Sequence, residues 1–221
     1  MEFQNLQVSE VTFKKTLSVR ENCSLFTVEA RGQICVMKVH PGHDPTSLKI
    51  PYCETNMFVC ESTAYRRLSE AGLCERGVVP KFYGAIENID PKSCLPHLES
   101  FLADEFPPTA IFLEYIPGMK ELHWSDYTPE RMENFVKGLN EIHKALVVHA
   151  DVRPRNMMVL EGEPKRVLWI DFDRSQTLHG ELEDFQKEWI DFENGLLSCM
   201  GRDMEADFNE QTFNRTKMYY R

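Results

Sequence analysis

Two oppositely charged side chains interrupt apolar patterns in the first third of the chain. Lys38 lies in the apolar run 33–40, on the same face as Val36, because side chains along a strand alternate. Glu61 lies inside the apolar stripe of a helix expected over 56–73. A buried charge is costly unless an opposite charge meets it, although a lysine near a strand end can also reach solvent. The two interruptions together predict a Lys38–Glu61 ion pair.

The polar loop HADVRPRN, which follows the clearest expected helix, gathers side chains that could handle a phosphoryl group. Asp151 could accept a proton from an attacking hydroxyl, Arg153 could neutralise phosphate charge, and Asn156 offers an amide oxygen to a metal. Asp171 ends a later apolar run, where a carboxylate either starts a turn or binds Mg²⁺ together with phosphate oxygens. Asp173 either adds a metal ligand or caps a turn. The pattern predicts a metal-assisted phosphoryl-transfer site.

These motifs resemble those of the protein-kinase superfamily. HADVRPRN resembles the catalytic loop H-R-D-x-x-x-x-N of protein kinases and H-G-D-x-x-x-x-N of aminoglycoside and choline phosphotransferases. I-D-F-D at 170–173 stands where kinases have D-F-G, V-M-K at 36–38 resembles V-A-I-K, and Glu61 resembles the glutamate of the following helix. The resemblance covers about residues 8–175 in the right order. It is nearest to the small kinase-like proteins that are abundant in filamentous fungi.

The resemblance implies an enzyme that transfers the γ-phosphate of ATP, with Mg²⁺, to a hydroxyl of a small-molecule or atypical acceptor. The implied catalytic residues are Asp151 as the base, Arg153 near the transferred phosphate and Lys38 on the α/β-phosphates. The implied nucleotide contacts are Lys38, Glu61 and the hinge residues Glu114, Tyr115 and Ile116. The implied metal ligands are Asn156, Asp171 and Asp173.

Two departures argue against a conventional protein kinase. No G-x-G-x-x-G separates the first two strands, where residues 18–24 read SVRENCS, so no glycine lid over the phosphates is expected. Only 221 − 171 = 50 residues follow Asp171, and none matches the A-P-E of a peptide-docking segment. These departures also support a rival hypothesis, a catalytically inactive pseudokinase that binds nucleotide or a partner. The retained polar residues oppose that rival.

The first half of the chain is predicted to form the β-rich part that positions Lys38 and Glu61. The expected elements are strands at 8–17, 24–30, 33–40, 81–87 and 110–116, a turn at 31–32 and a helix over 56–73. An insertion at about 88–109 separates the last two strands. Together they predict an N-terminal lobe over 1–116, a five-stranded antiparallel sheet with one helix.

The second half, 117–221, is predicted to form a mostly helical lobe. Thr128 and Pro129 begin a helix whose apolar positions keep helical spacing as far as Leu146. A hairpin then pairs 157–160 with 167–172, and a last helix covers 180–200. The expected apolar stripe of that helix is Leu182, Phe185, Trp189, Phe192 and Leu196. The prediction is an α+β chain in two kinase-like lobes, hinged near 115–121.

Composition limits the classes of partner. With 25 basic and 35 acidic residues the net charge is −10, which disfavours nucleic acid and anionic membranes. No apolar run of 18 residues and no signal peptide is evident, and the seven cysteines are scattered as reduced thiols would be, so a cytoplasmic location is expected. The acceptor pocket would draw on 88–109, 118–127 and the last helix. Aromatic residues of the tail could pack on a neighbouring molecule.

Three other chemistries fit the residues less well. The stretch 167–175 (VLWIDFDRS) resembles the D-x-D strand of haloacid-dehalogenase phosphatases, but the 50 residues after Asp171 are too few for the sheet domain those enzymes need. A glycosyltransferase D-x-D site would leave the residues upstream of it without a role. His40, His43, Asp44 and Cys53 match no common zinc spacing, and a solvated loop explains them better.

Overall fold

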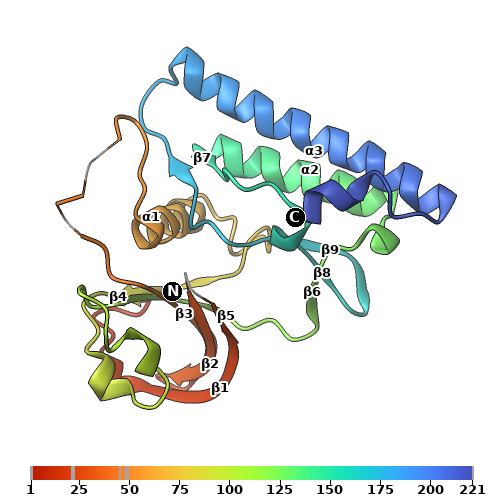
Figure 1. Ribbon diagram of the computed structural model, residues 1–221. Coiled ribbons are helices and arrows are strands. Elements are labelled where there is room, and N and C mark those ends of the chain that lie inside the picture. The colour runs from red at the N-terminus through yellow and green to blue at the C-terminus, as the bar shows by residue number, and fades with distance from the viewer. Residues whose placement is uncertain (1, 21–22, 45, 48–49, 221) are drawn as a thin grey trace. The chain divides into compact units, whose positions relative to one another are not determined.

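The structure is a computed structural model that describes residues 2–20, 23–44, 46–47 and 50–220 (Figure 1). It confirms the α+β class. Residues 21–22, between the first two expected strands, and residues 45, 48 and 49, before the expected helix, lie outside the described ranges. Within the described ranges, no helix combines the length and apolarity that a membrane crossing requires.

Contacts divide the chain into two compact units. The first unit comprises Met1–Ser62 and Lys81–Tyr115, and the second comprises Thr63–Pro80 and Ile116–Arg221. The sequence assigned 63–80 to the first lobe, but these residues belong to the second unit. For example, Trp169 donates its backbone N–H to the Val78 carbonyl at 3.0 Å.

A five-stranded sheet in the order β1-β2-β3-β5-β4 forms the first unit, and every neighbouring pair is antiparallel. The strands are β1 (Val11–Val19), β2 (Ser24–Ala30), β3 (Gln33–His40), β4 (Phe82–Ile86) and β5 (Thr109–Glu114). Val8–Glu10, expected to begin the first strand, is instead a 3₁₀ turn, η1. Arg31 and Gly32 both have positive φ, 50° and 78°, as a two-residue hairpin turn between β2 and β3 requires.

Helix α1 (Met57–Glu70) confirms the helix expected over 56–73. Asn56 caps its start, because the side-chain oxygen accepts the backbone N–H groups of Phe58 and Val59 at 3.0 and 3.3 Å. Gly72 follows its end with φ 75°, a left-handed conformation that glycine adopts without strain.

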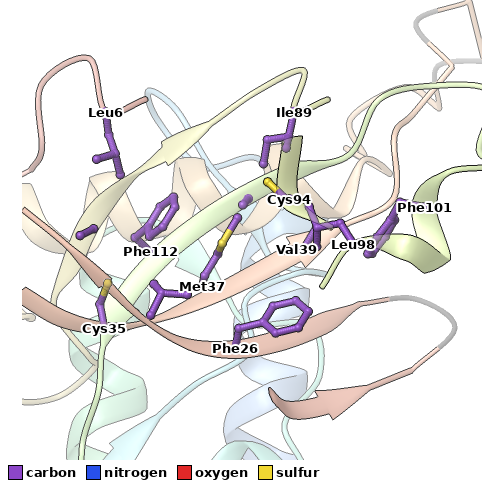
Figure 2. Close-up of a cluster of buried hydrophobic side chains, with 13 residues drawn as sticks. Leu6, Phe26, Cys35, Met37, Val39, Ile89, Cys94, Leu98, Phe101 and Phe112 are labelled. Carbon is purple, nitrogen blue, oxygen red and sulfur yellow. The ribbon is translucent and has the colours of Figure 1, made fainter. Parts of the chain in front are cut away.

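The insertion between β4 and β5 packs on one face of the sheet. It contains two 3₁₀ helices, η2 (Pro91–Cys94) and η3 (Glu99–Phe101). Figure 2 shows its apolar side chains meeting those of the strands in one cluster, which includes Ile89, Cys94, Leu98, Phe101, Phe26, Met37, Val39 and Phe112. Because side chains alternate along β3, Lys38 faces the opposite side from Met37 and Val39. The insertion's buried side chains therefore serve the core on the sheet face away from Lys38.

The second unit pairs two helices with two small sheets. Helices α2 (Pro129–Lys144) and α3 (Asp184–Glu210) lie side by side (Figure 1). One sheet has the order β6-β8-β9 and the other pairs β10 with β7. The strands are β6 (Met119–Glu121), β7 (Val147–Val148), β8 (Met157–Leu160), β9 (Glu163–Trp169) and β10 (Gln176–Thr177). The 3₁₀ helices are η4 (Trp124–Asp126), η5 (Pro154–Asn156) and η6 (Thr216–Tyr220).

Helix α2 and the hairpin that follows it are confirmed, but the second strand of the hairpin, expected over 167–172, begins at Glu163 and ends at Trp169. Thr128 accepts the Arg131 N–H at 3.1 Å, which confirms it as the cap before Pro129. A Cβ added to Gly138 would lie 3.2 Å from the Trp169 ring, so this glycine lets β9 approach the helix closely. Strands β8 and β9 are antiparallel and place the end of the hairpin just before residues 170–173.

The apolar stripe predicted for the last helix is right only in part, because Leu182, Phe185, Trp189 and Leu196 are half-buried but none of them is among the fully buried residues. Helix α3 buries Glu193, Leu197, Met200, Met204 and Asp207. Phe192, which the stripe included, is 70% exposed. Two of the buried residues are acids, which a hydrophobicity pattern assigns to solvent, so the buried face lies at a different angle around the helix from the predicted one.

The second of these acids, Asp207, fastens the C-terminal tail. Its carboxylate accepts the Thr216 N–H and hydroxyl at 2.9 and 2.7 Å, the Arg215 N–H at 3.1 Å and the Thr212 hydroxyl at 2.9 Å. Burial alone would raise the pKa of Asp207, but these hydrogen bonds hold it well below its ordinary value. Tyr220 donates its hydroxyl to the Leu122 carbonyl at 3.0 Å, so this tail aromatic packs on its own chain.

We predict that Asp207→Asn lowers the free energy of unfolding by about 2–3 kcal/mol at pH 7, because several buried donors lose a charged acceptor. Since the folded pKa lies below the unfolded one, the stabilisation is complete above about pH 4 and is lost as the pH falls through the folded pKa. Urea unfolding at pH 7 and pH 3 measures both effects. Asp184→Asn, on the exposed first turn of the same helix, is the control and should cost less than about 1 kcal/mol. Equal losses in the two variants would contradict the prediction.

Candidate functional site

In the first unit, Lys38 and Glu61 form the predicted ion pair. Lys38 Nζ lies 2.8 Å from Glu61 Oε2, and the exposed fractions of the two side chains are 7% and 0%. His40, two residues along β3 on the same face, places its Nε2 2.9 Å from the same carboxylate oxygen. The sheet thus directs two nitrogen donors at a single oxygen on α1.

His40 is a buried member of this cluster, and the sequence did not assign it there. Its Nε2 faces a carboxylate oxygen, so the proton belongs on that nitrogen. Among the described residues, its buried Nδ1 has no hydrogen-bond partner, and neither has the hydroxyl of Thr109, the residue opposite His40 on β5. The sequence signal that could have revealed the role of His40 is its spacing, because residues two positions apart in a strand share a face and Lys38 lies two positions before it. His40 is held by Glu61 and does not belong to a solvated loop.

The expected hinge residues lie where β5 ends. The backbone N–H of Glu114 donates to the Lys81 carbonyl at 2.8 Å, and its carboxylate accepts the Lys81 N–H at 3.2 Å. Tyr115 is exposed, and Ile116 is buried beside Met158 in the second unit. The Glu114 N–H is therefore already engaged, whereas its carbonyl and the two following residues remain the candidates for contact with a base.

In the second unit, the loop around Asp151 is tied together by its own side chains. Asp151 Oδ1 lies 3.0 Å from Arg153 Nε, and Oδ2 lies 2.7 Å from Arg155 Nη2. Asn156 donates its side-chain N–H to the Asp151 carbonyl and to Oδ2 at 2.8 and 2.9 Å. Because the amide nitrogen of Asn156 is committed to Asp151, its amide oxygen is the atom that can face a cation.

Hydrogen bonds connect this loop to the segment carrying Asp171. Ile170 donates its N–H to the Asn156 carbonyl at 3.1 Å, and the Ile170 carbonyl lies 3.0 Å from His149 Nε2. Phe172 is buried between the rings of His149 and Tyr65, with centroids 4.6 and 5.3 Å away. Asp171 has φ 69°, an uncommon backbone conformation for a residue with a side chain. The loop and this segment therefore form one connected structure.

Glu193 on α3 anchors the start of the loop. Its carboxylate accepts the backbone N–H groups of His149 and Ala150, and it lies 2.7 Å from His143 Nε2. Ala150 has φ 61°, a strained value that these bonds help to maintain. Sequence reasoning missed Glu193, although an acid one turn after Trp189 on an amphipathic helix gives the same signal that revealed Glu61.

The oxygen ligands proposed for a metal fit a hard cation only in part. The hydrogen bond to Asp151 is the main cause that raises the pKa of Arg155, and the charges of Asp171 and Asp173 add to it. No group of three or more His, Cys, Asp or Glu side chains in the described part of the chain is arranged to hold a metal ion by itself. A Mg²⁺ ion at this place would need phosphate or water oxygens to complete its shell, which is its usual mode of binding.

The predicted residues thus fall into two sets. Lys38 and Glu61 meet in the first unit, and Asp151, Arg153, Asn156, Asp171 and Asp173 gather in the second. The structure adds His40, Arg155 and Glu193. A scan against protein-family models found no match, and a search of curated proteins found none either.

We predict that Glu61→Ala destabilises the chain more than Lys38→Met does. Removing Glu61 takes away the anion that Lys38 and His40 share, whereas removing Lys38 leaves Glu61 still bonded to His40. Loss of the acid should cost about 3–5 kcal/mol. Urea unfolding of both variants at pH 7 measures the difference, and a larger loss in Lys38→Met would refute it.

We predict that Glu193→Gln loosens the Asp151 loop, because an amide cannot accept all the donors that the carboxylate accepts. The expected loss of stability is about 2–3 kcal/mol. Hydrogen exchange at the His149 and Ala150 amides should accelerate in the native protein. Glu188→Gln, the same substitution at an exposed position of α3, is the matched control and should leave that exchange unchanged. Unaltered protection of both amides in Glu193→Gln would show that the anchor is unimportant.

Proposed function

We propose that this chain is an ATP- and Mg²⁺-dependent phosphotransferase of the kinase-like superfamily, which transfers the γ-phosphate to a hydroxyl of a small-molecule or atypical acceptor. The observation that carries the proposal is the buried Lys38–Glu61 pair at 2.8 Å. A buried ion pair adds little stability compared with apolar residues of similar size. We therefore attribute the Lys38–Glu61 pair to a requirement for an ammonium group held in a fixed position, rather than to stability.

Residues of the second unit supply the other requirements of this chemistry. Asp151 would accept the proton of the acceptor hydroxyl, and Arg153 would neutralise charge on the transferred phosphate. Asn156, Asp171 and Asp173 would hold Mg²⁺, whose charge would offset the negative charge of the phosphates. Lys38 would hold the α/β-phosphates, and Glu114, Tyr115 and Ile116 would contact the base.

The second candidate is a pseudokinase that binds nucleotide or a partner without transfer. The observation that favours it is the arginine beside each carboxylate oxygen of Asp151. Both carboxylate oxygens are then occupied by hydrogen-bond donors, so an acceptor hydroxyl can reach Asp151 only when one of the arginines moves. Transfer measured alongside binding separates the two candidates. For either candidate we propose a cytoplasmic location, which the free cysteines among the described residues support.

We predict that calorimetry will detect ATP binding that requires Mg²⁺ and that Asp171→Ala abolishes, because the variant lacks a metal-binding carboxylate. Asp151→Ala should retain binding but lower turnover about a hundredfold or more, as expected for loss of a general base. Phosphate transfer to a panel of hydroxyl acceptors, with ATP hydrolysis in parallel, measures turnover. Asp184→Asn is the matched control. ATP binding without transfer or hydrolysis would favour the pseudokinase, and no Mg²⁺-dependent binding would refute the phosphotransferase.

A further inference from the structure

Two cysteine thiols of the first unit meet at one carbonyl oxygen, directly before Glu61. Cys53 lies in the irregular segment that precedes α1, and Cys60 lies in the first turn of that helix. The Cys53 thiol donates to the Glu54 carbonyl at 3.7 Å, and the Cys60 thiol donates to the same oxygen at 3.4 Å. The two sulfur atoms are therefore no more than 7.1 Å apart, the sum of these two distances.

The helix holds one of these cysteines firmly, whereas the segment holds the other loosely. Cys60 is 4% exposed, and its backbone N–H donates to the Asn56 carbonyl at 2.9 Å. Cys53 is half-buried, and its backbone N–H donates to the nearby Ile50 carbonyl at 3.2 Å. Its neighbours Ile50 and Tyr52 are 52% and 72% exposed. Little packing therefore opposes a movement of the Cys53 segment towards α1.

We propose that Cys53 and Cys60 form a reversible disulfide, with oxidised glutathione or another small disulfide as the oxidant. Both residues are thiols in the structure. A disulfide holds its sulfur atoms about 2 Å apart, so the two thiols must approach each other. A change of rotamer at Cys53 and a shift of its weakly packed segment would supply that approach while the helix stays in place.

The reaction is a pair of thiol–disulfide exchanges. The Cys53 thiolate attacks one sulfur of oxidised glutathione, which forms a mixed disulfide and releases one glutathione thiolate. The Cys60 thiolate then attacks the Cys53 sulfur, which forms the protein disulfide and releases the second glutathione thiolate. The two thiol protons pass to the two glutathione thiolates, and the oxidant gains the two electrons that the protein loses. Reduced glutathione reverses both steps, so the bond would respond to the redox state of the compartment.

Two other thiols of the first unit are poor partners for this exchange. Burial raises the pKa of Cys35 to about 11 and also raises the pKa of Cys94. Because the thiolate is the reactive form, both should react slowly. They belong to the apolar cluster of Figure 2, on the sheet face away from Lys38. Cys60 is also buried, but its reaction with Cys53 is intramolecular and therefore favoured by proximity.

The disulfide would fasten the segment to the first turn of the helix that carries Glu61. Asn56 lies between the two cysteines and caps this turn through the N–H groups of Phe58 and Val59. A cross-link over the cap removes open conformations that the turn can otherwise visit. Amide exchange at Phe58, Val59 and Cys60 should therefore be at least about threefold slower in the oxidised chain, and reduction should restore it.

The test is oxidation of the full native chain with excess oxidised glutathione at about pH 8, near the ordinary pKa of a thiol. The remaining thiols are then alkylated, and peptides are analysed without reduction by mass spectrometry. Cleavage after Glu54 separates Cys53 from Cys60, so the two peptides stay joined only through a disulfide. Joined peptides should account for most of the natural chain and should separate on reduction.

Three variants identify the pair. In Cys60→Ser, the glutathione adduct at Cys53 should accumulate at least about tenfold above its level in the natural chain, because the thiol that displaces glutathione is missing. The new hydroxyl can keep the hydrogen bond to the Glu54 carbonyl, which favours normal folding. Cys53→Ser should yield no joined peptides. Cys199→Ser, at an exposed position of the second unit, is the matched control and should form the pair as the natural chain does.

Persistence of the adduct at Cys53 in the natural chain, at the level found in Cys60→Ser, overturns the disulfide. An unmodified Cys53 in the natural chain overturns it as well, as does a bond from Cys53 to a third cysteine. The inference does not rest on the proposed function, because none of these measurements involves ATP or phosphate transfer.

Discussion

A carboxylate removed from water must be surrounded by donors, and this constraint organises both units of the chain. Glu61, Asp151, Glu193 and Asp207 are all buried. The carboxylate of each residue accepts hydrogen bonds from a segment elsewhere in the sequence or from its own loop, and not from the helix that carries it. These acids fix which strand end, loop or tail lies against which helix, because any other arrangement would leave a charge without partners.

The same contacts that satisfy these acids position the groups proposed for chemistry. Glu61 holds Lys38 through an oxygen that it shares with His40, so the ammonium group has a fixed place on the sheet. Glu193 holds the backbone of the loop that presents Asp151. In both cases an acid on a helix restrains a shorter, less regular segment. Stability and the geometry of the proposed site therefore depend on the same few hydrogen bonds.

Asp151 shows how the local charge balance bears on activity. The residue is buried and is the base in the proposed reaction, yet an arginine lies beside each of its oxygens. One of these arginines, Arg153, was expected to serve the phosphate, whereas the second was unexpected. An anion that enters the loop would attract both arginines, so the number of hydrogen bonds that the Asp151 carboxylate accepts depends on what is bound next to it. The net acidic charge of the whole chain says little about such a loop.

The amino-acid sequence alone predicts the α+β order, the cap at Thr128 and the Lys38–Glu61 pair, because each depends on neighbours in the chain or on a charge that breaks a local pattern. Only the tertiary structure revealed the true buried face of α3 and the partners of Glu193 and Arg155. The predicted stripe of α3 was drawn through apolar residues alone, so it missed the face on which Glu193 and Asp207 are buried. The donors that bind the Glu193 carboxylate come from residues more than 40 positions away in the sequence. The packing of the chain brings them together, and the spacing of residues along the sequence does not reveal it.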